Sequence, residues 1–453
     1  MKPMRETLTE KLYSRIASDI RSGRLAAGTK LPSLRKEAEE SGMSINTVIG
    51  AYNLLLSEGY VTAREKSGFY VAEFESLIPQ MPVQDNRTAA EEKPQVKEDF
   101  TDLSSNLVDS SLFPFSTLRQ LYRETLSARN RHILEQSGPF TGEEDLRQAI
   151  AFYLMEHKEI SCSPRQVVIG NGTTFHLQLL PSLLPSRPVF LMEKPGFEST
   201  REIIRDTGCR IIDIPVDNEG ASISQIREST EKIKDRPVFL HVSPSHQFPL
   251  GTTMTAPRRA SIIEWANMGS QRYIIEDDYD SEFRYNGRPI APLCNMDKSG
   301  RVIYLGTFSR TLTPSIRISY MILPPDLVDI YMEKFSRYPC PVSRIDQKAV
   351  ALFISGGYFS RHISRMRRIY KSRRNEMIRL IREALPSAQI KGEEAGLHFI
   401  MRCPTDERSF TEKARQSGLR IQGTGTGWLV IGYAHLSEEE MQKFSSFLRH
   451  IEQ

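Results

Sequence analysis

Several polar residues stand where short apolar segments end, and they could bind an anion. Gly172, Thr173 and Thr174 follow one such segment and precede an amphipathic one, so their amides and hydroxyl groups could bind a phosphate at a helix N-terminus. Ser309 follows another such segment, and Arg317 could also bind an anion, because a guanidinium can bind phosphate through two hydrogen bonds. Taken alone, the threonine pair is more typical of an ordinary helix cap.

A carboxylate at the end of another apolar segment suits a different task. Asp277 could stabilise a cation or a protonated base beside it, because a nearby negative charge favours the charged form of a base. Together with its neighbour Asp278, it also fits a solvated loop, and the two interpretations stay open on these residues alone.

Six short apolar segments are the predicted strands that would position these residues, at 167–169, 189–192, 211–214, 238–242, 273–275 and 302–305. They alternate with longer amphipathic stretches, which predicts an α/β fold with a mainly parallel sheet covered by helices on both faces. Ligands bind at the carboxyl ends of parallel strands, which is where the residues above stand.

The totals fit a water-soluble protein with more than one domain. The 453 residues exceed one ordinary domain, and 26% are charged while 39% are hydrophobic. Lys and Arg number 60 against 56 Asp and Glu, and a net charge of +4 does not by itself indicate a nucleic-acid partner. The sequence opens without an apolar leader, and no segment approaches membrane-spanning length, so we expect a cytoplasmic protein without membrane contact.

The cysteines predict neither disulfides nor a metal site. They are odd in number and scattered without a CxxC pair, at Cys162, Cys209, Cys294, Cys340 and Cys403. This usage favours a reducing compartment, and we expect no metal ligands among them.

Three zones differ in sequence pattern. Residues 1–75 predict three short helices and a hairpin, and residues 103–453 carry the α/β pattern. Residues 76–102 are poor in large apolar side chains and contain three prolines, which predicts a linker.

The first zone has the element order of a winged helix-turn-helix. Apolar residues share one face between 13 and 20, Ser33 is a predicted N-cap, and Gly42 marks a tight turn. A third helix is predicted for residues 45–57, and residues 66–69 resemble a hairpin tip.

The segments GRLAAGTKLPSLR (23–35), SINTVIGAYNLLLSEGY (44–60) and SGFYV (67–71) resemble the GntR family of transcription regulators. The resemblance implies binding to a double-stranded DNA operator through Ser44, Asn46 and Thr47 at the start of the third helix, Arg35, and Arg64 and Lys66 in the wing. Ile45 departs from the family pattern, which often has arginine there, so one phosphate or guanine contact is expected to be absent.

Beyond about residue 100 the sequence resembles fold-type I aminotransferases. The resemblance rests on GNGTT (170–174), SPSHQFP (243–249), IEDDYD (275–280), GTFSR (306–310) and SIRIS (315–319). With the first zone included, the whole chain resembles the MocR subfamily of GntR regulators, and most closely its γ-aminobutyrate-responsive member. A pyridoxal phosphate transferase-like domain with a large and a small α/β part is therefore expected, together with a homodimer.

The resemblance implies roles toward pyridoxal phosphate for several residues. Thr173, Thr174, Ser309 and Arg317 would bind the phosphate, and Asp277 would face the pyridine nitrogen. Tyr279 would donate to the phenolic oxygen, and Phe197 would stack on the ring. Singly, each is as well explained by capping or core packing.

Arg310 stands where the family carries its Schiff-base lysine. Arginine stays protonated, so Arg310 is not expected to bond covalently to the cofactor or to shuttle a proton. We therefore expect noncovalent, weakened binding of pyridoxal phosphate, with Arg310 adding a cation near it. Whether Arg310 is natural or an introduced replacement is left open by the sequence.

The predicted function is a DNA-binding regulator whose second domain senses pyridoxal phosphate or an amine-bearing metabolite without transaminase turnover. Glu198 and Ser199 stand where the γ-aminobutyrate regulator has an arginine, so a different effector is expected. The alternatives are an active aminotransferase with an attached DNA-binding module, and a regulator whose second domain serves only for dimerisation. A basic run between Arg361 and Arg374 is interpreted as a solvated helix face.

Overall fold

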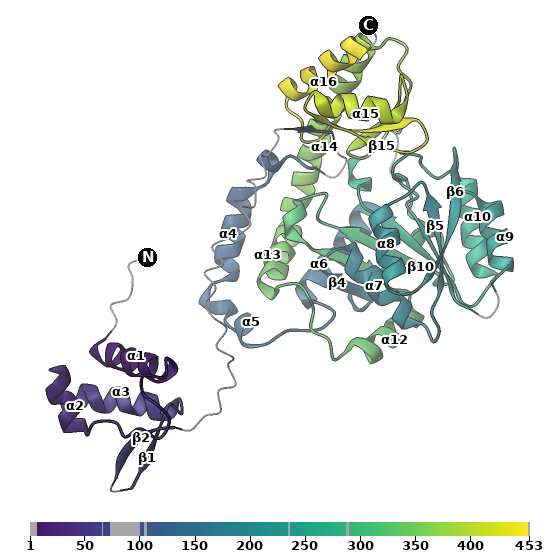
Figure 1. Cartoon of the computed structure of the whole chain (residues 1–453). Helices are drawn as coiled ribbons and strands as arrows, with labels where there is room; N and C mark the ends of the chain where they lie inside the picture. The colour runs from purple at the N-terminus through teal and green to yellow at the C-terminus, as the bar shows by residue number, and fades with distance from the viewer. Residues whose placement is uncertain are drawn as a thin grey trace. The chain divides into compact units, whose positions relative to one another are not determined.

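The computed structural model describes residues 7–65, 67–72, 100–103, 107–233, 236–286 and 290–451. The chain forms two compact units, Met1–Val96 and Lys97–Gln453 (Figure 1). Each is described by itself below.

The first unit contains three helices and a hairpin: α1 (Leu8–Arg21), α2 (Leu34–Ser41), α3 (Ile45–Ser57), β1 (Val61–Arg64) and β2 (Gly68–Val71). Ser33 caps α2 by accepting a hydrogen bond from an amide three residues ahead. Gly42 ends α2 with φ 67°, the left-handed conformation that a tight turn requires. The predicted winged helix-turn-helix order is confirmed, including both ends of the third helix.

The core of the first unit is formed where α1 and α3 pack together, with Leu12, Ile16, Ala17, Ile20, Val48, Ala51, Tyr52 and Leu55 buried. Tyr13, expected on the apolar face of the first helix, is half-buried and donates a hydrogen bond to Glu58. Leu12, the residue before Tyr13, is buried instead. Because a helix turns about 100° per residue, adjacent residues point in different directions, and the face that contains Ile16 and Ile20 includes Leu12 rather than Tyr13.

The second unit is built on an eight-stranded sheet in the order β4-β11-β10-β9-β8-β5-β6-β7. The strands are β4 (Val167–Gly170), β5 (Val189–Lys194), β6 (Arg210–Asp217), β7 (Gly220–Ala221), β8 (Val238–Val242), β9 (Arg272–Asp278), β10 (Val302–Thr307) and β11 (Ser319–Ile322). All six predicted strands are present, and β5, β6, β8, β9 and β10 pair in parallel. Strands β7 and β11, which pair antiparallel with their neighbours, were not predicted from the sequence.

Helices cover both faces of this sheet, as predicted. One face packs against α7 (Thr173–Leu183), α8 (Glu198–Asp206) and α12 (Pro325–Phe335). The other face packs against two groups of helices. One group is α9 (Ile223–Glu231), α10 (Ala256–Asn267) and α11 (Leu293–Met296). The second group packs on β4, β10 and β11 and consists of α4 (Phe115–Thr125), α6 (Glu144–Lys158) and α13 (Arg344–Ser355). Short helix α5 spans His132–Glu135.

A smaller antiparallel sheet forms the C-terminal part, in the order β12-β13-β16-β15. Its strands are β12 (Ile390–Lys391), β13 (His398–Arg402), β15 (Gln422–Gly423) and β16 (Trp428–Gly432), and it packs with α14 (Tyr358–Ala384), α15 (Glu407–Gln416) and α16 (Glu438–Ile451). The expected division into a larger and a smaller α/β part is therefore confirmed.

The predicted linker spans residues 76–102, and its C-terminal boundary is wrong. Strand β3 (Thr101–Asp102) pairs in parallel with β14 (Leu419–Arg420), and Thr101 is buried, so these residues belong to the second unit. The linker at 76–99 lies outside the described residues. None of the described helices combines the length and apolarity needed to cross a bilayer.

Candidate functional site

Three consecutive acidic residues end β9, and all three are buried: Glu276, Asp277 and Asp278. Successive side chains of a strand point to opposite faces of the sheet. Asp277 therefore shares the face of α7 and α8, while its two neighbours share the face of α6 and α11. Their surroundings decide which of these charges is compensated inside the protein.

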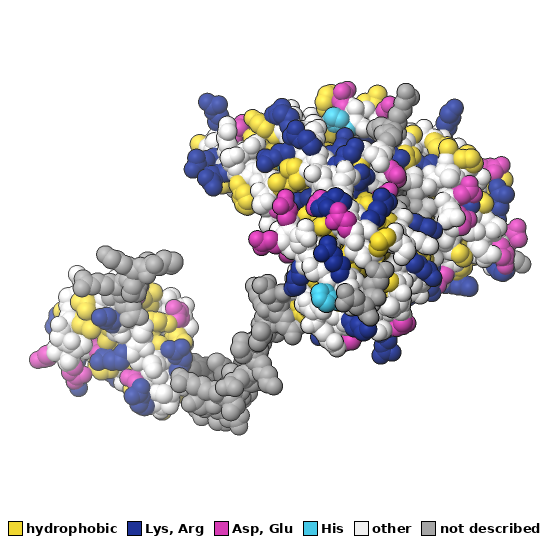
Figure 2. Space-filling view, turned by 90° about the horizontal axis from the view of Figure 1, so that it is seen from above, with side chains coloured by type: hydrophobic (Ala, Val, Ile, Leu, Met, Phe, Trp, Pro, Cys, Tyr) yellow, Lys and Arg dark blue, Asp and Glu magenta, His cyan; other side chains and the backbone are white. Residues whose placement is uncertain are grey.

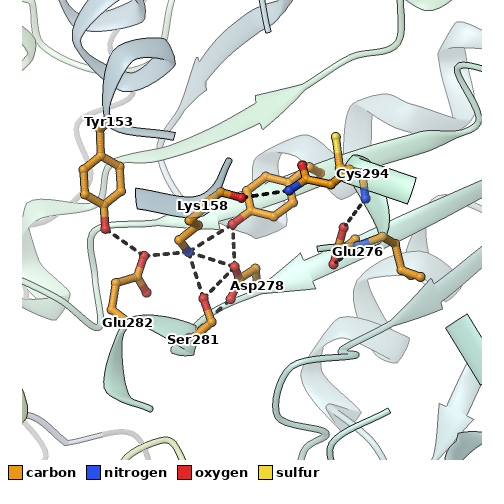
Figure 3. Close-up of polar contacts among 10 residues, drawn as sticks. Tyr153, Lys158, Glu276, Asp278, Ser281, Glu282 and Cys294 are labelled. Atoms are coloured by element: carbon orange, nitrogen blue, oxygen red, sulfur yellow. Dashed lines mark hydrogen bonds and ion pairs between the residues drawn. The ribbon is translucent and has the colours of Figure 1, made fainter. Parts of the chain in front are cut away.

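Glu276 is bound by the backbone. Its two oxygens accept hydrogen bonds from the amides of Leu293 (2.9 Å) and Cys294 (3.0 Å), at the start of α11 (Figure 3). Burial raises the pKa of Glu276 to about 7, and these amide donors act against the shift. Glu276 therefore anchors α11 to the sheet.

Asp278 is paired with a buried lysine. Lys158, the last residue of α6, lies 2.8 Å from Asp278 and 2.7 Å from Glu282, and its ammonium also donates to Ser281 and Tyr304 (Figure 3). Burial alone would lower the pKa of Lys158, but Asp278 and Glu282 hold it well above its usual value. This network fixes the end of β9 against α6.

Asp277 differs from its neighbours because one of its carboxylate oxygens has no hydrogen-bond partner among the described residues. Oδ2 lies 3.4 Å from Nε2 of His241 on β8, whereas Oδ1 is buried without a hydrogen bond among the described residues. A buried acceptor of this kind is costly unless a donor meets it. A protonated ring nitrogen would supply that donor.

A second buried acid lies beyond His241. Glu193 on β5 accepts a hydrogen bond from the Ser243 amide at 3.1 Å, and its other oxygen has no partner among the described residues. Burial raises the pKa of Glu193 to about 7, and the nearby His241 opposes the shift. Glu193, His241 and Asp277 come from three adjacent strands, because β8 lies between β5 and β9.

The predicted phosphate-binding residues meet beside the first turn of α7. Gly172 precedes this helix with φ 125°, and a Cβ there would lie 2.4 Å from a guanidinium nitrogen of Arg317. The guanidinium therefore lies against the amides that open α7, beside Thr173 and Thr174, which are half-buried. Amides at a helix start and an arginine together favour a bound anion.

Sheet register brings Ser309 to the same edge. Ser319 on β11 pairs with Gly170 on one side and with Thr307 on the other, so the residues that follow β4 and β10 leave the sheet side by side. The amide of Ser309 donates to Thr307 Oγ1 (3.1 Å), while the Ser309 hydroxyl is buried without a partner among the described residues. Together with Arg317, which is exposed and has no hydrogen bond among those residues, Ser309 fits a phosphate.

The aromatic residues of the site contact one another. Phe197 stacks on Phe248 with ring centroids 4.3 Å apart and meets Tyr279 edge-on at 5.2 Å. The Tyr279 hydroxyl donates to the carbonyl of His246 at 2.8 Å. Burial, followed by Asp280, raises the pKa of Tyr279 well above its usual value, so the hydroxyl remains a donor. Its predicted bond to a cofactor oxygen would therefore compete with an existing bond.

Arg310 is half-buried and follows Ser309 directly. Burial lowers the pKa of its guanidinium, and Asp280, Tyr279 and Asp277 act against that shift. A guanidinium among carboxylates stays charged, so the group at this position is a permanent cation. We use the name strand-end site for eight residues: Thr173, Thr174, Phe197, Asp277, Tyr279, Ser309, Arg310 and Arg317.

Several polar residues around the strand-end site were not predicted from the sequence. His241 and Glu193 are polar residues within otherwise apolar strands, a signal that could have identified them. Lys158 gave no such signal, because a lysine at the end of an amphipathic helix is ordinarily solvated. Its partners come from segments more than a hundred residues away.

In the first unit, the start of α3 is open to solvent. Asn46 is exposed and Thr47 half-buried, while Ser44 caps the helix by accepting from the Thr47 amide at 3.2 Å. Part of the role predicted for Ser44 is thus structural. Arg35 on α2 is exposed, Arg64 lies over the ring of Tyr70 at 4.4 Å, and Lys66 lies outside the described residues.

The basic run on α14 divides into two groups. Four of its members donate to backbone carbonyls at least 19 residues away in the sequence: Arg367, Lys371, Arg373 and Arg374. Arg361 donates to the carbonyl of Gly356, just before α14. Arg361, Arg365 and Arg368 line a hollow of about 420 Å³ with Ser360 and Ser364. These three arginines are exposed, as expected of a solvated helix face. Figure 2 shows Lys and Arg side chains interspersed with Asp and Glu on one face of the second unit.

Two family descriptions match the chain. "Bacterial regulatory proteins, gntR family" matches residues 8–71, and "Aminotransferase class I and II" matches residues 98–448. The two matches lie in the two compact units.

Curated relatives cover nearly the whole chain. The uncharacterised HTH-type transcriptional regulator YdeL of Bacillus subtilis is 36% identical over 449 residues, covering 96% of this chain and 95% of that protein. The probable rhizopine catabolism regulatory protein MocR of Rhizobium meliloti is 34% identical, with 97% and 92% covered. The pyridoxine biosynthesis regulator PdxR of Corynebacterium glutamicum is 28% identical, with 96% and 93% covered.

Solved aminotransferase structures share the fold of the second unit. An archaeal alanine:glyoxylate aminotransferase superposes with a TM-score of 0.69 at 26% identity, covering 78% of this chain and 90% of that one. A multiple-substrate aminotransferase of Thermococcus profundus gives 0.68 at 25% identity, with 83% and 96% covered.

The Lys158 network generates a testable expectation. Lys158→Met should lower the free energy of unfolding of the second unit by about 3–5 kcal/mol, because it leaves two buried carboxylates without their cation. Urea unfolding followed by tryptophan fluorescence measures this directly, since both tryptophans, Trp265 and Trp428, belong to the second unit.

Lys348→Met is the matched control, because Lys348 pairs with the half-exposed Asp145 and should contribute only about 0–1 kcal/mol. A loss at Lys158 no larger than that of the control would contradict the structural role given to this network.

Proposed function

The chain belongs to the family of HTH-type transcription regulators that join a GntR-type DNA-binding domain to a class I and II aminotransferase domain, and we propose that it regulates transcription in response to a phosphorylated pyridine ligand. The ligand is pyridoxal phosphate or an amine-bearing derivative of it, held without a covalent bond. The observation that carries this proposal is the strand-end site, where a buried oxygen of Asp277 and the buried hydroxyl of Ser309 have no hydrogen-bond partner among the described residues.

The residues present fit the cofactor of the aminotransferase relatives. Arg317, Ser309 and the first amides of α7 would hold the phosphate, and Asp277 would hold the ring nitrogen protonated. Phe197 would lie on a ring face once Phe248 gives way. When bound to an enzyme with a reactive lysine, this cofactor activates amino groups for proton transfer.

Arg310 argues against turnover of that kind. A transaminase needs an amine that can lose its proton, both to bond to the aldehyde and to move a proton on the substrate. Arg310 stays protonated, and no lysine is among the residues of the strand-end site. The chain would therefore bind and release the ligand unchanged, as a sensor requires.

An effect on transcription requires that the ligand bind more tightly to one arrangement of the DNA-binding units than to another. The direct experiment measures the affinity of the purified protein for a duplex chosen by selection from random DNA, with and without pyridoxal phosphate. Equal affinities in both conditions would reject the sensing role. Transfer of an amino group from any common donor would favour the alternative of an active aminotransferase.

The binding mode generates one prediction. The unaltered protein should bind pyridoxal phosphate reversibly in equilibrium dialysis and show no covalent adduct after borohydride treatment and mass spectrometry. Arg310→Lys should give a stable adduct after the same treatment, because it restores a deprotonatable amine.

In this assay Arg317→Ala should weaken noncovalent binding roughly 10- to 150-fold, since a hydrogen bond to a charged group contributes about 1.5–3 kcal/mol. Arg365→Ala removes an arginine outside the site and should leave binding unchanged. A borohydride-stable adduct in the unaltered protein would contradict the proposed mode.

DNA recognition is proposed to use the start of α3. Asn46 would reach base edges and Thr47 a base or phosphate, while Arg35 and Arg64 would contact the backbone. Ile45 and Ile49 are 46% and 38% exposed on the same helix, one turn apart. Apolar side chains there fit thymine methyl groups, so the operator should contain thymine at the positions they face.

Asn46→Ala should cost about 1–3 kcal/mol of binding to the selected duplex, roughly 5- to 150-fold in Kd, and relax selectivity at one position. Arg64→Ala should weaken binding to all sequences alike and reduce the slope of log K against log salt by about 1. Fluorescence anisotropy over a salt series measures both. Identical behaviour of the two variants would argue against a base contact by Asn46.

A homodimer is proposed because large apolar side chains remain exposed on α4 and α6, two helices that both pack on α13. These are Phe115, Leu126, Phe152 and Met155, with exposed fractions of 53–67%. Burying such side chains against a second copy removes apolar surface from water.

Light scattering after gel filtration should give twice the chain mass of 51.7 kDa for the unaltered protein and a lower mass for Phe152→Asp combined with Met155→Asp. Met268→Asp changes an equally exposed residue that follows α10, away from α4 and α6, and should keep the dimer. A monomeric unaltered protein would reject the proposal.

A further inference from the structure

Phe248 covers one face of the aromatic ring that a ligand at the strand-end site would need. It lies in the loop after β8 and is only 7% exposed. Its ring is parallel to that of Phe197 within 6°, and the two ring centroids are 4.3 Å apart. The two rings are therefore stacked, and a third ring can use the covered face of Phe197 only after Phe248 has left it.

The turn that carries Phe248 is fixed by its own hydrogen bonds. The amide of Gly251 donates to the carbonyl of Gln247 at 2.7 Å. The side-chain amide of Gln247 donates to the carbonyl of Pro195 at 2.8 Å and to that of Phe248. Because these bonds hold the backbone on both sides of Phe248, its ring can leave Phe197 only by turning about the side-chain bonds or by moving together with the whole turn.

Phe248 also contacts the smaller sheet, through His398 at the start of β13. The two rings meet edge to face, with centroids 5.5 Å apart and an interplanar angle of 63°. His398 is 1% exposed, and its Nε2 lies 3.1 Å from the carbonyl of Pro249, the residue after Phe248. Since protein interiors are close-packed, a shift of the Phe248 ring acts directly on His398.

Sheet register extends this contact to the segment that follows the linker. His398 lies opposite Gly432 of β16, and the amide of Gly432 donates to the carbonyl of Leu103 at 2.8 Å. The amide of Leu103 donates to the carbonyl of Arg420 at 2.9 Å, where β3 pairs with β14. Leu103 is fully buried and directly follows β3. The first described segment after the linker is therefore bonded to the strand that pairs with His398.

We propose that Phe248 is an autoinhibitory residue of the strand-end site: its ring and the ring of a ligand compete for Phe197, and its release is passed through His398 to Leu103. The segment after the linker then differs between the ligand-free and the liganded protein, which a signal to the DNA-binding unit requires. The competition rests on the proposed function, whereas the connection from Phe248 to Leu103 exists without a ligand.

Competition and simple packing predict opposite effects of Phe248→Ala on ligand binding. Loss of a ring that only fills the core would weaken binding, whereas loss of a competitor should tighten it. In equilibrium dialysis Phe248→Ala should bind pyridoxal phosphate roughly 2- to 12-fold more tightly than the unaltered protein, which corresponds to the strength of one aromatic pair. Unchanged or weaker binding would overturn the proposal.

Phe140→Ala is the matched control. Phe140 stacks on Tyr331 with ring centroids 6.0 Å apart, a contact that involves neither Phe197 nor His398. Its loss should leave the affinity unchanged, and an equal gain in this variant would count against competition. If Phe248→Ala does not fold, Phe248→Leu replaces it, because leucine fills part of the same space without a ring to stack, and the same direction is expected.

Hydrogen exchange followed by mass spectrometry tests the connection without any ligand. In Phe248→Ala the amides of Leu103 and Gly432 should exchange about 2- to 12-fold faster than in the unaltered protein, because β13 loses the ring packed against His398. Phe140→Ala should leave both amides unchanged. Unaltered exchange in Phe248→Ala would overturn the connection and with it the proposal.

A double-mutant cycle tests whether the effect passes through His398. His398→Gln keeps a donor for the carbonyl of Pro249 but lacks the ring that Phe248 contacts. It should speed exchange of the Leu103 amide by itself, and adding Phe248→Ala should change the rate little further, because both substitutions break the same contact. Effects that simply add would refute the route through His398.

Addition of pyridoxal phosphate joins the two halves of the proposal. The ligand should speed exchange of the Leu103 and Gly432 amides in the unaltered protein and have no further effect in Phe248→Ala. Binding without any change of exchange in the unaltered protein would overturn the proposal. If neither the unaltered protein nor Phe248→Ala binds pyridoxal phosphate, the proposed cofactor is rejected instead, and the ligand-free exchange decides the role of Phe248.

Discussion

Burying charge at the end of one strand is the constraint on which the second unit depends. Glu276, Asp277 and Asp278 follow one another on β9, and a buried carboxylate is stable only where donors or cations meet it. The protein satisfies the outer two by different means, with backbone amides at Glu276 and with Lys158 at Asp278. These bonds hold β9 to α11 and α6, and so fix the position of the third acid between them.

Strand alternation then sets Asp277 apart from its two acidic neighbours. Because Asp277 points to the opposite face from its neighbours, Lys158 and the amides of α11 lie on the other side of the sheet from it. His241 lies 3.4 Å from one of its oxygens, and the other has no hydrogen-bond partner among the described residues. The β4-β11-β10 register brings the start of α7 and Ser309 to the same edge, where a phosphate and a ring nitrogen could be bound at once.

Arginine at position 310 changes what such a site does. A neutral amine could attack an aldehyde, whereas a guanidinium can only attract and orient an anion. Together with Arg317 it gives this end of the sheet two permanent positive charges. Joined in one chain to a GntR-type domain, this arrangement suits reversible binding, and a reversible signal is what a regulator of transcription needs.

The sequence by itself determined the element order, because apolar periodicity and cap residues are local properties. The third helix at 45–57, the cap at Ser33 and the six core strands were all predictable on that basis. The antiparallel strands β7 and β11, and strand β3, were not, since their pairing depends on segments distant in the sequence. The surroundings of Asp277 and Asp278 were likewise decided only by tertiary structure. Lys158 and His241 stand far from these acids in the sequence, and folding brings Lys158 to 2.8 Å from Asp278 and His241 to 3.4 Å from Asp277.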